Sequence, residues 1–248
     1  MMNNALDDVN NYAQILGKIV GKVERNFEAY GEGFYGFNLA INRLSEEIDT
    51  IPVTISERIV KAKDLNLVEG EELCFSGEFR SYNKNVDGRS RLMLHFFVHN
   101  VISEEELLNA SDLEPVLGEY VQLNKEKGSN HNLIKLEGFI CKPPIYRVTP
   151  FNREICDVLL AINRPNHTSK TFCKSDYIPC ILWGRNARFA GKMAIGDKIR
   201  VMGRIQSRDY NKKQENGAFE VKTAYEISCQ SVILCENESK SKKEEEIV

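Results

Sequence analysis

Two segments in the second half of the chain alternate their side chains with a period of two, the spacing of a β-strand. In residues 176–185, Ile178, Cys180 and Leu182 fall on one face and are small enough for a core. In residues 198–210, the alternate positions from Ile199 to Ile205 form a second apolar face. Both segments therefore predict strands that pack one face on a hydrophobic core.

The opposite faces of these two strands carry aromatic and cationic side chains. Tyr177 and Trp183 share a face of the first strand, roughly 20 Å apart when the strand is extended. Arg185 follows Trp183, which is the only tryptophan of the chain. The second strand presents one row of six residues that includes three arginines and a tyrosine: Arg200, Met202, Arg204, Gln206, Arg208 and Tyr210. Flat rings beside cations are typical of a groove in which nucleic-acid bases stack.

Other interpretations of the two strands stay open at the level of sequence. The first strand also fits a segment that is buried on both faces, with Trp183 in the core. The second strand also fits a solvated face with surface arginines, although no Asp or Glu interrupts the row before Asp209. The interpretations differ in whether the aromatic side chains reach solvent.

Further motifs surround these strands in a fixed order. They are Leu136–Gly138, Val158–Pro165, Asp176–Gly184, Gly196–Tyr210, Gly217–Val221 and Glu226–Leu234. With these motifs, residues 133–235 closely resemble the bacterial single-stranded DNA-binding protein family. The resemblance implies an OB-fold, a five-stranded Greek-key barrel, and binding of single-stranded DNA with little readout of its sequence.

The resemblance also assigns roles to individual residues. Stacking on bases is implied for Tyr177, Trp183 and Tyr210, although the family often has Trp where this chain has the two tyrosines. A further stacking aromatic of the family has no match in residues 166–169. Basic positions of the family match or lie near Arg147, Arg164, Arg185 and Arg208. Position on the second strand and on the following hairpin loop adds Arg204 and Lys212 to the predicted DNA-binding residues.

The net charge of −3 is unevenly distributed along the chain. Residues 1–131 hold 13 Lys and Arg against 22 Asp and Glu, a net charge of −9. Residues 132–235 hold 17 against 9, a net charge of +8, and residues 236–248 hold 3 against 5. The positive charge is therefore confined to the segment with the aromatic strands, which indicates an electrostatic binding surface there.

The first half of the chain repeats the order of elements of the second. The tetrapeptide Ala40–Arg43 recurs at Ala161–Arg164, 121 positions later. Three further residues have counterparts 126 positions later, which pairs Gly70 with Gly196, Gly77 with Gly203 and Ser81 with Ser207. We infer an internal duplication, so residues 12–101 are predicted to form a second, divergent OB-fold. Its first strand fits two registers, on Gly17 or on Gly21.

The two halves differ at the positions that matter for stacking. Aligning Pro52 with Pro179 places Thr50 opposite Tyr177 and Ser56 opposite Trp183, and Glu78 falls opposite Arg204. An acidic surface without stacking rings repels phosphate, so the first barrel is predicted to bind DNA weakly and to serve a structural or partner-binding role. The alternative is that this barrel binds DNA through Arg80, Tyr82, Arg89 and Arg91.

The predicted organisation is all-β, with two OB-folds in tandem and short helices. The expected segments are an acidic barrel at 12–101, a linker at 102–131, a basic barrel at 132–235 and an acidic tail at 236–248. The linker is expected to hold a short helix at 103–109, because Ser103–Glu106 has the pattern of a capping box. The end of the tail, Glu244–Val248, is similar in kind to the family's partner-recruiting terminus, and replication or repair proteins are the partners that it implies. Two-barrel members form homodimers, which is the expected assembly.

Composition excludes several other classes. The four histidines are scattered, without a carboxylate pair or a nucleophile motif, so an enzyme is not expected. The seven cysteines have no zinc-site spacing, so no metal is predicted, and no cofactor is expected either. Four of them, Cys74, Cys156, Cys180 and Cys229, fall within apolar strand patterns and are interpreted as reduced core residues of a cytoplasmic protein. No apolar run is long enough to span a membrane. The function expected is sequence-tolerant binding of single-stranded DNA in replication, recombination or repair; an accessory module for RNA or a replication protein is the alternative.

Overall fold

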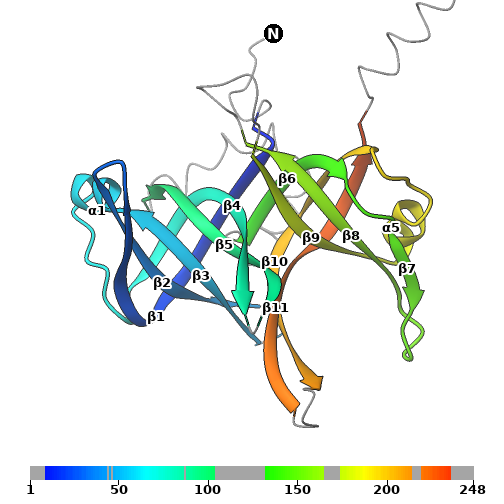
Figure 1. Cartoon of the computed structure of the whole chain (residues 1–248), viewed down its shortest axis with the longest axis horizontal. Coiled ribbons are helices and arrows are strands. Elements are labelled where there is room, and N and C mark those ends of the chain that lie inside the picture. Colours follow the sequence, from blue (N-terminus) through cyan, green and yellow to red (C-terminus); the bar gives the residue numbers. More distant parts are fainter. Residues whose placement is uncertain are drawn as a thin grey trace, which may run out of the picture.

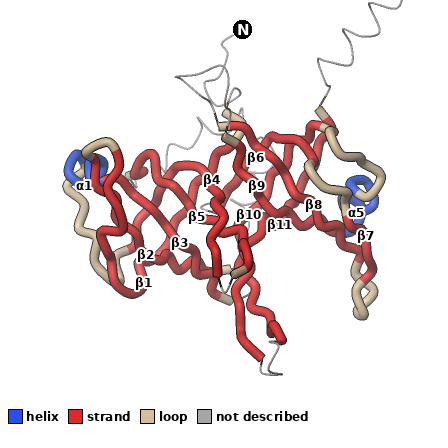
Figure 2. Tube along the Cα trace, in the orientation of Figure 1, coloured by secondary structure: helices blue, strands red, loops and turns tan. Residues whose placement is uncertain are grey.

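The computed structural model describes residues 9–43, 45, 47–86, 88–103, 132–164, 174–213 and 219–235. Within these residues the chain is almost entirely strand, arranged as two barrels side by side (Figures 1 and 2). The first barrel contains β1 (Asn11–Ala29), β2 (Glu32–Asn42), β3 (Ile48–Ser56), α1 (Glu57–Ala62), β4 (Glu72–Val86) and β5 (Arg89–Ile102). The second contains β6 (Asn132–Ile140), β7 (Ile145–Val148), β8 (Glu154–Asn163), β9 (Ser175–Trp183), α5 (Gly184–Ala190), β10 (Lys198–Lys213) and β11 (Phe219–Leu234).

Each set of strands closes on itself. In the first barrel, hydrogen bonds run in the order β1, β2, β3, β5 and β4, and β4 returns to β1. In the second barrel, the order β6, β8, β9, β11 and β10 returns to β6, and β7 extends as a hairpin from β8. Each of these closed rings contains one parallel pairing, which joins β3 to β5 in the first barrel and β9 to β11 in the second. These are the two tandem OB-folds predicted from the sequence.

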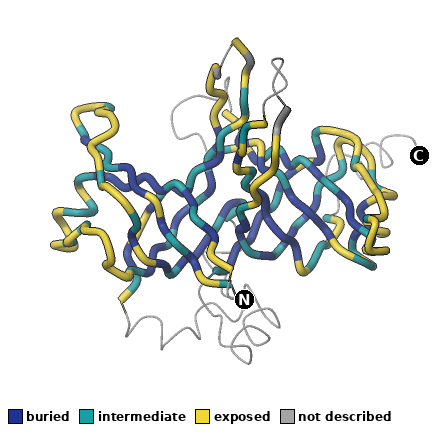
Figure 3. The backbone as a smooth tube through the Cα atoms, turned by 90° about the horizontal axis from the view of Figure 1, so that it is seen from below, coloured by how far each residue is buried: buried dark blue, intermediate teal, exposed yellow. Residues whose placement is uncertain are grey.

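The alternating apolar faces line the inside of the barrels, and Figure 3 shows the buried segments gathered in the bodies of the two barrels, with the projecting hairpins exposed. Ile178, Cys180 and Leu182 of β9 are at most 2% exposed. Ile199 and Ile205 of β10 are fully buried. The predicted core faces of both strands are therefore confirmed.

Close backbone contacts at glycine show that the two barrels are copies of one pattern. A side chain on Gly17 would meet the Ala40 carbonyl oxygen at 2.7 Å, and one on Gly138 would meet the Ala161 carbonyl oxygen at 2.6 Å. These two contacts are related by the 121-residue offset of the repeat. Gly21 instead has a φ of 73° and open space around its Cα. The register of the first strand is thus the one based on Gly17.

The barrels are joined through their first strands. β1 and β6 pair antiparallel, and Ala13 lies opposite Ile134, its own counterpart in the repeat. The junction is therefore nearly two-fold symmetric around this pair. One continuous sheet crosses from the first barrel to the second, which fixes their relative orientation by main-chain hydrogen bonds.

Two equivalent side-chain clusters reinforce the junction. Asp49 on β3 is fully buried, accepts hydrogen bonds from Arg43 and from the Ser207 hydroxyl at 3.0 Å, and so links the barrels. In the symmetric cluster, Asp176 on β9 accepts two hydrogen bonds of 2.6 Å from Arg164 and one of 2.6 Å from the Ser81 backbone N–H. We call these the junction clusters. Buried carboxylates need such complete pairing, because an unpaired buried charge is costly.

The helices follow the third strand in both barrels. Ser56 caps α1, as the sequence indicates, with its hydroxyl accepting from the Ile59 backbone N–H at 3.4 Å. The counterpart helix α5 begins after Trp183, which provides no side-chain cap. Apart from Ser103, the predicted linker helix lies outside the described residues, as does the tail. In the described part of the chain, neither helix has the length and apolar character that a membrane crossing requires.

Candidate nucleic-acid interface

The three predicted stacking residues lie on the outer face of the second barrel. Tyr177, Trp183 and Tyr210 are 42%, 38% and 41% exposed. Trp183 is held in place by its indole Nε1, which donates to the Ser228 hydroxyl at 3.2 Å across to β11. The interpretation of Trp183 as a core residue is therefore wrong, since its ring reaches solvent while remaining fixed.

Two grooves lie beside these rings, one at Tyr210 and one at Trp183. A groove of about 510 Å³ is lined by Pro179, Tyr210 and Tyr225 of the second barrel and by residues 91–94 of β5. A second groove of about 500 Å³ runs beside Trp183 and is lined by residues of the β7–β8 hairpin, including Arg153. Rings beside open, partly apolar grooves are the arrangement in which an unstacked base is accommodated.

The arginines of β10 face carboxylates that the sequence pattern did not reveal. Arg200 pairs with Glu137 at 2.7 Å. Arg204 lies 3.8 Å from Asp49 of the first barrel, and Arg208 lies 3.8 Å from Glu226 on β11. The row itself contains no acid before Asp209, and the carboxylates that face it come from neighbouring strands. Ion pairs near 4 Å at a surface are weak, so Arg208 remains available to a phosphate.

The other predicted cations are placed differently from one another. Arg185 is exposed in the first turn of α5, next to Trp183, and forms no ion pair with the described residues. Arg147 on β7 pairs with Asp157 on β8 at 2.6 Å, with half of its side chain exposed. Lys212 lies on β10, with its side chain outside the described set.

Arg164 occupies a junction cluster. Its guanidinium makes two hydrogen bonds to Asp176 and reaches the Ser81 carbonyl oxygen of the first barrel at 3.4 Å. The hydrogen bond to Asp176 raises the pKa of Arg164, helped by the charges of Asp176 and Glu78 and opposed by burial. A guanidinium that makes these hydrogen bonds links the two barrels. The geometry gives no support to its predicted contact with phosphate.

Sequence reasoning named Tyr82 on the first barrel but missed the aromatic residues that lie in line with it. Ring centroids are 5.5 Å apart for Tyr82 and His95 and 6.5 Å apart for His95 and Phe97. The ring centroids of Phe97 and Phe34 are 5.9 Å apart, and Phe34 stacks on Phe27 with centroids 4.8 Å apart. We call these five residues the aromatic row. The signal was the period-two order of residues 95, 97 and 99 in β5, which marks one outward face.

Residues 131–235 match the profile of the single-strand binding protein family. The match falls on the second barrel and leaves the first barrel outside it. The match covers the barrel with Tyr177, Trp183 and Tyr210, and it ends with β11.

Relatives of the single-strand binding protein family resemble the same part of the chain. Single-stranded DNA-binding protein 1 of Staphylococcus aureus is 30% identical over 106 residues, which cover 42% of this chain and 61% of that protein. Single-stranded DNA-binding protein 1 of Lactococcus lactis is 33% identical over 84 residues, which cover 34% and 56%. The chain thus spans little more than half the length of these relatives.

A solved structure extends the likeness to both barrels. The wild-type single-stranded DNA binding protein from Thermus aquaticus superposes with a TM-score of 0.58 and covers 92% of this chain and 93% of its own. Identity is only 16%, so the likeness is one of fold. It shows that the tandem arrangement of OB-folds is a known architecture.

Proposed function

We propose that this chain binds single-stranded DNA by stacking bases on the outer face of the second barrel. The observation that carries the proposal is the set of Tyr177, Trp183 and Tyr210, each about two-fifths exposed, with one groove beside Tyr210 and another beside Trp183. Aromatic rings stack on any base, so this mode of binding tolerates sequence. The net charge of +8 over residues 132–235 attracts the phosphate backbone.

The relatives support the same ligand. Proteins of Staphylococcus aureus and Lactococcus lactis that resemble the second barrel are named single-stranded DNA-binding proteins. By the same resemblance we propose a role in replication, recombination or repair. A homodimer, and recruitment of replication or repair proteins by Glu244–Val248, are part of this proposal.

Trp183 provides the direct test, because it is the only tryptophan and lies at the proposed contact. Adding oligo-dT to the full chain is expected to quench its fluorescence, and a duplex of equal length is expected to compete poorly. Trp183→Ala should weaken binding by about 1–3 kcal/mol, the usual contribution of one stacked base.

One control variant makes this result specific. Tyr30→Ala removes a fully exposed ring from the turn between β1 and β2 and is expected to leave affinity unchanged. Unquenched tryptophan at saturating oligo-dT, with binding confirmed by anisotropy of a labelled strand, would contradict the proposal.

A further inference from the structure

The aromatic row occupies the first-barrel equivalent of the stacking face. The strand registers make Ser56 of β3 the counterpart of Trp183, and Phe97 of β5 the counterpart of Ser228. In the second barrel the ring is on the third strand and the serine on the fifth. In the first barrel the serine is on the third strand and the ring on the fifth. The first barrel therefore carries this ring on its fifth strand, next to the strand that carries it in the second barrel.

The row crosses several strands of the first barrel. Tyr82 lies on β4, His95 and Phe97 on β5, Phe34 on β2 and Phe27 on β1. Tyr82 and Phe27 at its two ends are each 49% exposed. His99 adds a further ring 5.8 Å from Phe97. A path of rings across the strands is what successive bases of a single strand require.

Charge along the row is balanced rather than repulsive. Arg80 places its guanidinium carbon 3.4 Å from the centre of the Phe97 ring and also pairs with Glu78. Burial alone would raise the pKa of Glu78, but hydrogen bonds and charge from His99 and Arg80 outweigh it and lower the pKa to about 2. The carboxylate of Glu78, near the middle of the row, is thus neutralised by its neighbours. A stacked guanidinium also offers charge to phosphate and a flat surface to a base.

Acids farther along the first barrel are paired as well. Glu57 of α1 lies 2.6 Å from Lys61 and 3.5 Å from Arg25. Glu32 lies 3.7 Å from Arg58. The net charge of −9 over residues 1–131 therefore overstates the repulsion that a strand would meet on this face.

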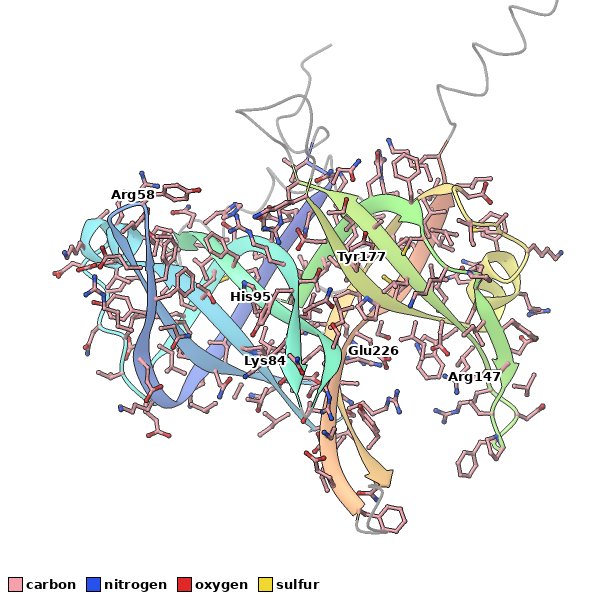
Figure 4. All side chains as sticks on the ribbon, in the orientation of Figure 1. Arg58, Lys84, His95, Arg147, Tyr177 and Glu226 are labelled. Carbon is pink, nitrogen blue, oxygen red and sulfur yellow. The ribbon has the colours of Figure 1, made fainter. Side chains whose placement is uncertain are left out.

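The row is continuous with the interface of the second barrel. The backbone N–H of Tyr177 donates to the hydroxyl of Ser81 at 2.7 Å, and Tyr82 is the next residue. The groove of about 510 Å³ is lined by Leu92 and Met93 of the first barrel and by Tyr210 of the second. In Figure 4, His95 and Tyr177 lie on either side of the junction between the barrels.

We propose that the aromatic row is a second surface on which bases of single-stranded DNA stack, so that one strand runs from Trp183 and Tyr177 across the junction onto the first barrel. This rests on the proposed function of the second barrel. It replaces the sequence-based expectation that the first barrel binds DNA weakly.

The test compares Tyr82→Ala and His99→Ala with Tyr30→Ala in the full chain. An oligo-dT of about 30 nucleotides exceeds the length that one OB-fold covers. Its affinity is expected to fall by at least about fivefold for Tyr82→Ala, the fold-change of one lost stack, and by a similar factor for His99→Ala. Quenching of Trp183 at saturation should persist in both variants, since the second barrel is intact.

Affinities of both variants equal to that of Tyr30→Ala would overturn the aromatic row while leaving the proposed function standing. Failure of the proposed function shows itself separately, as absence of Trp183 quenching in the unaltered chain. Photocrosslinking the unaltered chain to oligo-dT that carries 5-iododeoxyuridine covers the case of a variant that does not fold. Crosslinks at Tyr82 or at residues 95–99 support the proposal, and crosslinks confined to residues 175–235 overturn it.

Discussion

At the scale of single residues, Arg208 is the cation of β10 whose partner is easiest to exchange. Its side chain is 58% exposed and lies 3.8 Å from Glu226, beside Tyr210 on the same strand face. Arg164, by contrast, is held by Asp176 in the junction. Two arginines that look alike in the sequence therefore differ in what they can offer a phosphate.

Arg208→Ala is expected to make the salt dependence of DNA binding shallower. Each phosphate contact contributes about −0.7 to the slope of log K against log salt for a single strand, so the slope should change by about that amount. The measurement is a titration with a short oligo-dT at several salt concentrations. Lys63→Ala, which removes the same charge just after α1, should leave the slope as it is. An unchanged slope for Arg208→Ala would remove this residue from the interface.

His95 gives the stability of the chain a specific pH dependence. Burial, and then the positive charge of Arg80, lower its pKa from 6.5 to about 4, and its Nδ1 has no hydrogen-bond partner among the described residues. A lowered pKa means that the folded state binds the proton more weakly than the unfolded state. The contribution is therefore present above pH 6.5 and is lost as the pH falls toward 4.

The free energy of unfolding is expected to decrease by about 2–3 kcal/mol between pH 7 and pH 4.5 on account of His95. Urea unfolding at the two pH values measures this difference. His95→Gln, which cannot titrate, should lose that part of the decrease and keep the rest. The same decrease in both proteins would show that His95 titrates normally in the folded state.

At the scale of elements, period-two alternation determined the strands well. It located β9 and β10 and the core faces of both. It did not reveal α5, although the duplication contained the signal, since α1 and α5 follow the same strand in the two barrels. Trp183 carries no capping hydroxyl, so the local sequence did not indicate that a helix begins after it.

The hairpins of the fourth and fifth strands are longer than the sequence indicates. Residues 83–88 include two asparagines, an aspartate and a glycine, which are typical of turns, yet β4 continues to Val86 and β5 begins at Arg89. β10 likewise continues to Lys213. Antiparallel pairing between the two strands of each hairpin provides hydrogen bonds that override weak local strand propensity. These extensions form the walls of the groove at the junction, with Leu92 on one side and Tyr210 on the other.

At the scale of the whole molecule, the paired first strands make the chain resemble a dimer folded from one polypeptide. Because Ala13 and Ile134 are counterparts that face each other, β6 uses the same edge for β1 that a second β6 would use. Removing the first barrel exposes this edge, and an exposed strand edge is a template for pairing with another chain.

A fragment of residues 132–235 is therefore expected to associate into a dimer through β6, with Ile134 opposite its copy. Sedimentation at several concentrations measures this, and the full chain at equal concentration provides the comparison, because β1 already occupies its β6 edge. A folded fragment that remains monomeric at all concentrations would contradict the pairing. The fragment contains no residue of the first barrel, including Ser81, which contacts Tyr177 in the full chain. Its DNA affinity therefore measures binding by the second barrel without the first.

The sequence by itself determined the strands, their buried faces, the repeat, and the aromatic residues Tyr177, Trp183 and Tyr210 on one outer surface. Alternation along a strand suffices for this, because it sorts each side chain to one of two faces. Only the tertiary structure decided which carboxylates meet Arg204 and Arg208, that Arg164 joins the barrels, and that rings from β1, β2, β4 and β5 form one row. These contacts depend on the register between strands far apart in the chain, and periodicity within one strand carries no information about its neighbour's register.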